Sequence, residues 1–309
     1  MNSIKNIFAL SLTLVSSLAL AADFPHRRDL NARSLAVGLG VDSVMPLMRN
    51  AGPGATSVFG RLLERWSRST TSITTAGNYE ITEDEKGISA EGNGWSLTVL
   101  GDGTAVKYRN WAYHDAHGTL IDFGQRPPEP VLEEWGRRVL TAYLQGEVIL
   151  GPNEQLFPLS ARYETFSYQP TDLSRPAVDK AIGNVVVFTR GVNGIDVVGG
   201  GSKAAVFMEN DGTPYGFDFD WPTYSVVGDR VDVLSIDEIN NQDALLSDWQ
   251  FDASVTVATQ LFECGYFDAG TLFHDPQALV QPGCAYQRTA TFVGEVMGVI
   301  LAGTFTSDG

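Results

Sequence analysis

The fold predicted from this sequence is decided by residues Gly183–Trp221, which read GNVVVFTRGVNGIDVVGGGSKAAVFMENDGTPYGFDFDW. Runs of β-branched and aromatic residues alternate there with two turn dipeptides, Asn193-Gly194 and Asp211-Gly212, and with a glycine run, Gly199–Gly201. Asn-Gly and Asp-Gly between such runs favour type I′ hairpin turns, because both central residues of that turn need a positive φ. The stretch is therefore predicted to form a β-meander.

A helix precedes this stretch, and strands flank it on both sides. Val131–Gln145 follows three prolines, ends before Gly146 and carries its apolar residues on one helical stripe. Further strands are predicted at residues 79–81, 95–100, 104–110, 162–168, 230–234, 254–263 and 286–292. This order predicts an α+β fold in which a helix packs on an antiparallel β-meander. A weaker meander in the first half of the chain leaves two related halves open.

Composition divides the chain into four parts. Residues 1–21 are predicted to be a signal peptide, and residues 22–77 a small-residue-rich segment with a short helix at 58–66. The polar tract Ser67–Gly77, SRSTTSITTAG, is predicted to be a linker or exposed loop, because it has no apolar face to bury. Residues 78–125 form a β-rich segment, and residues 126–309 a helix-plus-meander domain with a second short helix opened by the capping box Ser235–Glu238.

The first residues have the layout of a secretory signal. Lys5 precedes an apolar run, Ile7–Leu20, and Ala19-Leu20-Ala21 supplies the small residues of a cleavage site. The apolar run is too short to span a bilayer. We therefore expect cleavage near Ala21 and a secreted protein, extracellular or periplasmic, without a membrane anchor.

Charge narrows the range of partners. The formal net charge is −16, and removal of a signal that holds one lysine and no acid leaves the mature chain at −17. Such a surface repels phosphate backbones and anionic membranes, and no basic cluster offsets it locally. We expect neither nucleic acid nor a membrane as a partner.

The two cysteines, Cys264 and Cys284, are predicted to pair. An oxidising compartment favours the disulfide, which would stabilise the fold by about 3 kcal/mol in the chain-entropy account. The alternative, a reactive thiol or a metal pair, lacks a CxxC partner, and His274 is the only histidine nearby.

Two histidines are candidate metal ligands. His114 and His117 would share one face of a helix and could hold a metal ion there. The surrounding residues, Tyr113–Gly118, are instead predicted to form a turn between strands, so solvated loop histidines are favoured.

Two aspartates are candidate catalytic groups. Asp218 and Asp220 alternate with aromatic residues, so both carboxylates lie on one face of a strand with Cα atoms about 7 Å apart. That separation suits an inverting glycosidase, in which one carboxyl protonates the leaving group and the other activates water. A water-facing acidic row is the simpler interpretation, and a calcium site without the spacing of an EF-hand is left open.

The glycine run could be mistaken for a phosphate-binding loop. Such loops lead into a helix N-terminus, whereas β-rich residues follow Ser202 here. A wide turn or bulge between strands is therefore predicted.

The meander also carries a resemblance. Its features are Arg190, Asn193-Gly194-Ile195, Val197–Gly200, the alternating strand Ala204–Phe207 and Asp211-Gly212. With these residues the segment resembles the propeptide-type modules of the FTP and PepSY families, which occur ahead of secreted metalloproteases and in bacterial envelope proteins. Together with the helix, the resemblance covers about residues 131–221. It implies a cystatin-like fold and a non-catalytic role.

The leading prediction is a secreted, non-enzymatic binding protein that inhibits or chaperones a secreted protease in trans. The turns of the meander would make the contact, through Asn193, Gly199, Gly200, Gly201 and Ser202. A secreted hydrolase that uses Asp218 and Asp220 is the second prediction. A surface or matrix component, with its acidic groups bridged by calcium, is the third.

Overall fold

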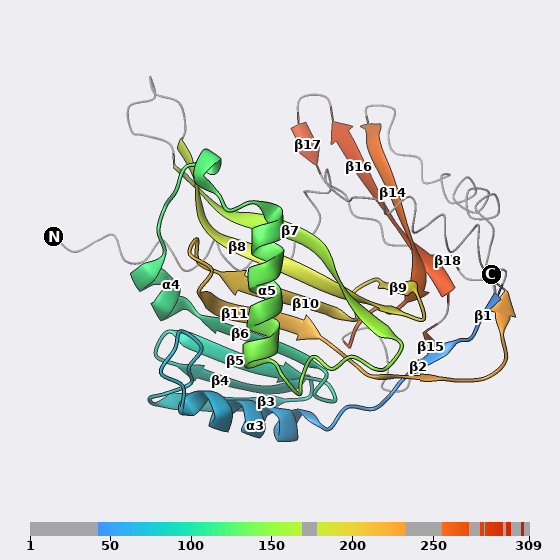
Figure 1. Cartoon of the computed structure of the whole chain (residues 1–309), viewed down its shortest axis with the longest axis horizontal. Helices are drawn as coiled ribbons and strands as arrows, with labels where there is room; N and C mark the ends of the chain where they lie inside the picture. The colour runs from blue at the N-terminus through green and yellow to red at the C-terminus, as the bar shows by residue number, and fades with distance from the viewer. Residues whose placement is uncertain are drawn as a thin grey trace. The chain divides into compact units, whose positions relative to one another are not determined.

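The computed structural model describes residues 43–168, 178–232, 255–271, 279–280, 282–292, 295–297 and 304–305. The chain forms two compact units (Figure 1). The main unit comprises Ser43–Asp232 and Gly265–Pro282, and the second unit comprises Met1–Asp42, Val233–Cys264 and Gly283–Gly309. The predicted signal peptide and the predicted capping box at Ser235 lie outside the described residues.

One large sheet organises the main unit. Its strands follow the order β9-β8-β10-β11-β6-β5-β4-β3, and β7 pairs with β8 as well. Their bounds are β3 (Tyr79–Asp84), β4 (Gly87–Gly92), β5 (Trp95–Leu100), β6 (Ala105–Asn110), β7 (Glu154–Tyr168), β8 (Val178–Val192), β9 (Ile195–Val198), β10 (Lys203–Met208) and β11 (Pro214–Asp220). All these pairs are antiparallel. The end of β14 (Val255–Phe267) then pairs in parallel with β9, which makes the sheet mixed.

Smaller strand pairs complete the two units. In the main unit β1 (Ser43–Val44) pairs with β13 (Val231–Asp232), and β2 (Leu47–Arg49) lies between β12 (Tyr224–Val226) and β15 (Leu279–Val280). In the second unit β16 (Pro282–Phe292) pairs with β17 (Glu295–Met297) and β18 (Thr304–Phe305). Cys264 and Cys284 lie in β14 and β16, and their disulfide stays a prediction.

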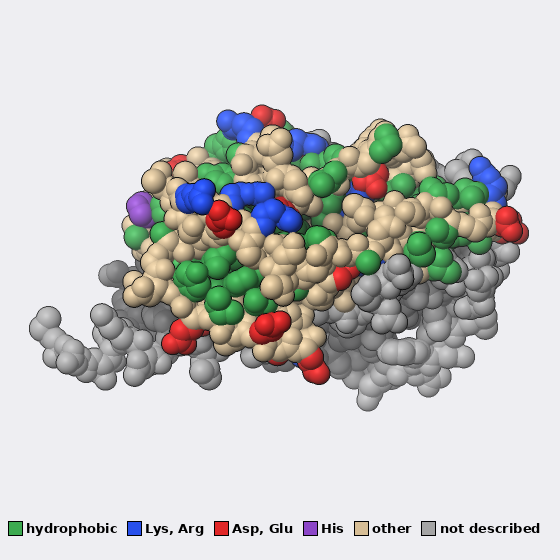
Figure 2. All heavy atoms as spheres, turned by 90° about the horizontal axis from the view of Figure 1, so that it is seen from below, with side chains coloured by type: hydrophobic (Ala, Val, Ile, Leu, Met, Phe, Trp, Pro, Cys, Tyr) green, Lys and Arg blue, Asp and Glu red, His purple; other side chains and the backbone are tan. Residues whose placement is uncertain are grey.

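Two helices cover one face of the main sheet. Helices α3 (Ala55–Ser67) and α5 (Glu129–Tyr143) share a single core with the strands, in which Trp66, Leu132, Phe188 and Phe217 are fully buried or nearly so. Gly136 lets α5 approach the sheet, because a Cβ atom there would lie 2.8 Å from the ring of Phe188. No helix in the described ranges is long and apolar enough to cross a membrane. Seen from below, charged side chains of both signs lie among hydrophobic and polar ones (Figure 2).

The predicted fold class, one helix on an antiparallel β-meander of cystatin type, is wrong. Strands dominate the described residues, and the main sheet is mixed and much larger than a meander. The halves are not separate either, because β6 pairs with β11 and joins the early strands to the later ones in one sheet with one core. The cause of the error is that this pairing joins residues far apart in sequence, which local periodicity does not report.

Both turns of the quoted stretch lie where they were predicted, but the two positive φ values of a type I′ turn occur only at Asn193-Gly194, because Asp211 has no positive φ. Asn193 and Gly194 have φ values of 53° and 81° and connect β8 to β9. Gly212 has a φ of 87° in the turn that connects β10 to β11. These turns follow directly from the residues that tolerate a positive φ.

The glycine run forms a bulge between β9 and β10, both of which pair with β8. The backbone of Asp268 enters this bulge, where its N–H donates to Val198 O at 2.9 Å and its carbonyl oxygen accepts from Gly201 N at 2.9 Å. Gly199 has a φ of 92°, and a Cβ atom there would collide with the carbonyl oxygen of Asp268. A Cβ on Gly200 would lie 2.7 Å from Ala269 O. The predicted bulge is therefore confirmed, and its glycines are required by the close approach of a second segment.

We predict that Gly199→Ala lowers the free energy of unfolding by at least about 3 kcal/mol, because it adds backbone strain to a clash with Asp268. Gly146→Ala is the matched control, since Gly146 also has a φ of 92° but has open space around it. In Gly146→Ala, backbone strain alone should lower the free energy of unfolding by about 1 kcal/mol. Urea unfolding followed by tryptophan fluorescence measures both, and equal losses would contradict the role given to the bulge.

Candidate functional site

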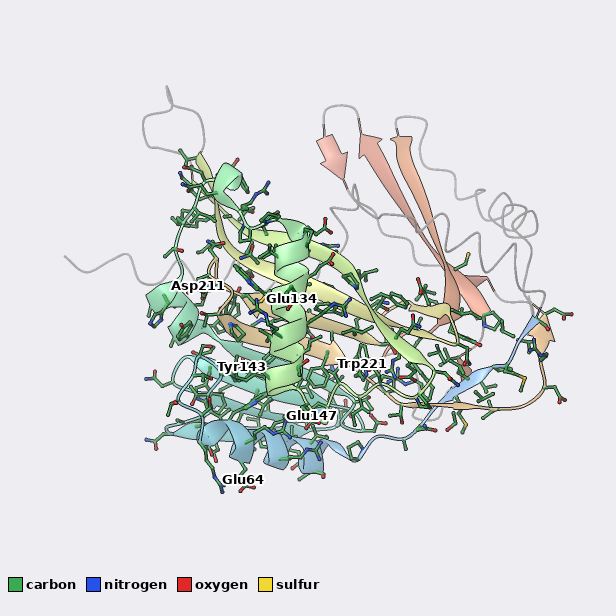
Figure 3. The ribbon with its side chains drawn as sticks, viewed as in Figure 1. Glu64, Glu134, Tyr143, Glu147, Asp211 and Trp221 are labelled. Atoms are coloured by element: carbon green, nitrogen blue, oxygen red, sulfur yellow. The ribbon has the colours of Figure 1, made fainter. Side chains whose placement is uncertain are left out.

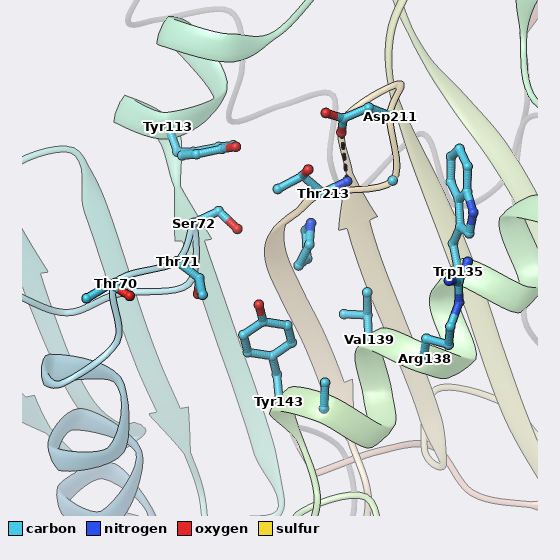
Figure 4. A pocket seen from close by; sticks show the side chains of 13 residues that line it. Thr70, Thr71, Ser72, Tyr113, Trp135, Arg138, Val139, Tyr143, Asp211 and Thr213 are labelled. Atoms are coloured by element: carbon cyan, nitrogen blue, oxygen red, sulfur yellow. Dashed lines mark hydrogen bonds between the residues drawn. The ribbon is translucent and has the colours of Figure 1, made fainter.

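A pocket of about 710 Å³ lies on the main unit beside α5. It is an open depression lined by four segments: the loop after α3, helix α4 (Trp111–His117), helix α5 and the turn between β10 and β11 (Figure 4). In Figure 3, Asp211 of the turn and Tyr143 of α5 lie on the same side of that helix. The volume falls in the range of small-ligand sites.

The α5 wall of the pocket carries aromatic and aliphatic groups. Trp135, Val139 and Tyr143 follow one another at helical spacing, so all three project toward the same side. Val139 is buried in the core, and the ring of Tyr143 lies 6.0 Å from that of Phe217. Trp135 and Tyr143 belong to the apolar stripe that the sequence predicts for this helix; both are half-buried, pack against the core and also line the pocket.

The turn wall is fixed by the Asp-Gly pair. The Oδ1 atom of Asp211 accepts a hydrogen bond from Thr213 N at 2.8 Å, which closes the turn on itself. Gly212 packs on the indole of Trp135, and a Cβ atom there would lie 2.7 Å from ring atom Cδ2. Glycine at this position therefore allows both the positive φ of the turn and the close contact with the ring of Trp135.

The loop wall comes from the tract Ser67–Gly77, which was predicted to be a linker or exposed loop and is a loop that is exposed at both ends and buried in its middle. Ile73 is fully buried, and the hydroxyl of Tyr108 accepts from Thr74 N at 2.9 Å and donates to Thr74 O at 2.7 Å. Burial raises the pKa of Tyr108, so this hydroxyl stays protonated. One apolar residue and one buried tyrosine thus anchor a tract whose composition alone indicates exposure.

Asn110 joins the loop wall to α4. Its Nδ2 donates to Ser72 O at 2.7 Å, and its Oδ1 accepts from Tyr113 N at 3.0 Å as the N-cap of α4. Because a carboxamide supplies both a donor and an acceptor, one buried side chain positions two lining residues.

Ser72 holds a hydroxyl without a partner. Its side chain is 5% exposed, and its Oγ has no hydrogen-bond partner among the described residues. In Figure 4, Ser72 lies on the loop side of the pocket and Thr213 on the turn side. A buried hydroxyl that is left unpaired costs about 1–3 kcal/mol, and because this oxygen has almost no accessible surface, a ligand would reach it only after the lining moves.

The charges of the lining nearly balance. It contains one basic side chain, Arg138, and one acidic side chain, Asp211. Arg138 lies 3.6 Å from Glu134 in an exposed pair on α5. Hydroxyl groups supply most of the remaining polar atoms, so the pocket suits a neutral polar ligand with an apolar face.

The two candidate aspartates have different partners. Asp218 pairs with Lys107 at 4.0 Å, and both side chains are well exposed. Asp220 accepts from Arg49 at 3.2 Å and from the Thr271 hydroxyl at 2.8 Å. The structure therefore holds Asp220 in a buried network and leaves Asp218 at the surface.

The predicted binding residues of the meander are also separated. Asn193 is exposed in its hairpin, whereas Ser202 is fully buried. Ser202 Oγ lies 2.6 Å from the hydroxyl of Tyr224, which donates to Asp268. Burial raises the pKa of Tyr224 well above its ordinary value, which keeps it a donor. The buried side chain of Ser202 thus links the bulge to Tyr224 through a hydrogen bond.

The predicted turn around the two histidines is wrong, because the residues form helix α4. His114 Nδ1 lies 2.9 Å from Glu209 Oε1, whereas His117 stacks on Tyr113 at 4.1 Å and faces solvent. Within the ranges that the structure describes, no three His, Cys, Asp or Glu side chains gather where they could hold a metal ion. The histidines therefore have separate environments.

A bulge in β11 builds a buried cluster around His114. Phe207 pairs with Gly216 and Met208 with Pro214, so Tyr215 is an extra residue and turns to the face away from α5. There it stacks on His114 at 4.4 Å and donates to Glu164. Burial raises the pKa of Glu164, and the hydrogen bond that His114 donates to Glu209 raises the pKa of His114.

We predict that His114→Gln destabilises the protein in a pH-dependent way. A histidine pKa raised by folding contributes stability below its unfolded value of about 6.5, and that stability is lost as the pH rises through the folded pKa. The loss should be about 1–2 kcal/mol near pH 5.5 and smaller near pH 8.5. His117→Gln is the control, and an equal loss at both pH values would contradict the charged pair with Glu209.

Comparison with known proteins finds no family model and no curated sequence that matches this chain. Among solved structures, the chain is similar to the crystal structure of an uncharacterized protein from Eubacterium rectale ATCC 33656, with a TM-score of 0.43 and 12% sequence identity. The match covers 86% of this chain and 84% of that chain. A likeness at this level assigns no function, and the resemblance to FTP and PepSY modules stays a prediction.

Proposed function

We propose that this chain is a non-enzymatic binding protein that holds a neutral saccharide in the pocket beside α5. The observation that carries the proposal is the composition of the lining, in which the rings of Trp135, Tyr113 and Tyr143 occur together with hydroxyl-bearing residues such as Thr213. Such a lining favours a ligand that has an apolar face and hydroxyl groups of its own.

The chemistry of the lining favours a sugar ring. Sugar hydroxyls donate and accept, and so do the hydroxyls of Ser72, Thr213 and the two tyrosines. The C–H face of a sugar ring is apolar and suits the half-buried indole of Trp135. Arg138 and Asp211 add one group of each charge, which supports a neutral ligand rather than an anion or a cation.

The environment of the carboxylates supports binding over hydrolysis. Asp211, the one carboxylate of the lining, already accepts the hydrogen bond that closes its turn. Asp218 and Asp220 are engaged with Lys107 and Arg49, in two different surroundings. A glycosidase needs two carboxyl groups that flank one substrate bond.

The proposal includes export, with cleavage near Ala21 and an extracellular or periplasmic location. A secreted protease as partner rests on the resemblance of the meander. It stays a second proposal, and the pull-down of such a protease by the tagged mature chain tests it. A calcium-bridged matrix role is a third proposal, which concentration-dependent assembly with calcium would support.

We expect the mature protein to bind at least one neutral oligosaccharide among cellohexaose, xylohexaose, maltohexaose and chitohexaose, measured by isothermal titration calorimetry. Thr213→Val should weaken that binding about fivefold, since it removes one hydroxyl of the lining and keeps the size of the side chain. Trp135→Ala should weaken it at least about tenfold, since it removes the stacking face.

Two control variants lie outside the pocket. Ser67→Ala removes an exposed hydroxyl that donates to Glu64 O, and Trp111→Ala removes an exposed indole on α4. Both should leave the affinity unchanged. The absence of any binding, or equal losses in Trp111→Ala and Trp135→Ala, would refute the saccharide site.

A further inference from the structure

Strand β3 is an edge of the main sheet. It pairs with β4 from Tyr79 opposite Gly92 to Asp84 opposite Gly87, and β4 is its only partner in the described part of the chain. Alternate N–H and C=O groups on its outer side are therefore available to another strand. In Figure 1, β3 is the lowest labelled strand of the main sheet.

This strand contributes nothing to the core. All six of its residues are exposed, whereas β4 and β5 bury alternate side chains. Tyr79 and Ile81 are 41% and 52% exposed, which is high for apolar side chains in a sheet. Backbone bonds to β4 and the contact of the Tyr79 ring with Trp95, at 5.7 Å, keep the strand in place, and its side chains stay largely exposed.

The two faces of β3 differ in chemistry. One face carries Tyr79 and Ile81, followed by Glu83. The other carries Glu80 and Asp84 on either side of Thr82. No basic residue lies within the strand. An added strand would therefore meet acids on one face and mainly apolar groups on the other.

A second copy of the same strand does not fit this edge. Antiparallel pairing centred on Thr82 places Glu80 of each copy opposite Asp84 of the other, and like charges directly opposite destabilise a strand pair. Parallel pairing in register sets every acid against itself. Each copy also brings the same excess of negative charge, with a formal net charge of −16 for the chain.

We infer that β3 binds an extended basic segment of a partner protein by strand addition. Lysine or arginine side chains at every second position would pair with Glu80 and Asp84, and the alternate apolar side chains would cover Tyr79 and Ile81. The charges that repel a second copy then select the partner. This surface is independent of the pocket beside α5, so the two functions can be tested separately.

The first test separates strand addition from simple charge attraction. The probe is a fluorescein-labelled peptide, acetyl-KVKTKVK-amide, and the control peptide has the same sequence with N-methyl groups on alternate backbone amides. We expect fluorescence anisotropy at low ionic strength to show at least about tenfold tighter binding of the unmodified peptide, because only it can donate to the edge. Equal affinities, or no binding of either peptide, would overturn the inference.

The second test locates the site. Glu80→Lys with Glu83→Lys should weaken the peptide at least about tenfold, and neither side chain closes the turn as Asp84 does when it accepts from Lys86 N. Glu64→Lys with Glu134→Lys is the matched control, since it changes the net charge equally at exposed positions on α3 and α5 (Figure 3). It should weaken binding less than about threefold. Equal losses in the two double variants would place the peptide elsewhere, and unchanged thermal unfolding would exclude misfolding as the cause.

Discussion

The main unit depends on one buried cation, the guanidinium of Arg49. It donates to Asp268 at 2.6 Å, to Asp220 at 3.2 Å and to the Thr271 hydroxyl at 2.8 Å, and so ties β2 to β11 and to the segment after β14. Removal of one partner from such a buried group costs about 3–5 kcal/mol, because an uncompensated charge remains. The backbone of Asp268 also fills the glycine bulge, so the ion pair and the bulge hold the same segment from two sides.

Local chemistry in the sequence predicts much of the secondary structure. The Asn193-Gly194 and Asp211-Gly212 turns, β9, β5 and the helix after the prolines all lie where residue patterns place them. The order of the strands could not be predicted. Two pairings join residues that are distant in sequence: β6 pairs with β11, and Tyr266 pairs in parallel with Val197. The periodicity of a sequence does not predict such contacts. Helix α4 was missed because its seven residues are too few for a clear amphipathic pattern.

The pocket was hidden from sequence reasoning for a related reason. Composition assigned Ser67–Gly77 to a linker, although one isoleucine in the tract, Ile73, was the available signal for burial. Hydrogen bonds from Asn110 and Tyr108, two residues of β6, hold this hydroxyl-rich tract in place at the side of the pocket. Trp135 and Tyr143 carry the right apolar character for the core, and only the position of Gly212 shows that one of them faces a turn instead. The sequence therefore shows which types of residue line the pocket, but it does not show that these residues lie close together.

The extra residue in β11 has a consequence for how the two faces of the sheet are assigned. Strand alternation proceeds in steps of two, and Tyr215 shifts its phase by one, so that Pro214 faces the pocket while Tyr215 faces His114. Deletion of one residue at this point would restore the regular alternation of side chains along β11. The side chains of the Asp-Gly turn would then point to the opposite face of the sheet. The separation of the open pocket on one face of the sheet from the buried ionisable cluster on the other therefore depends on the single extra residue in this strand.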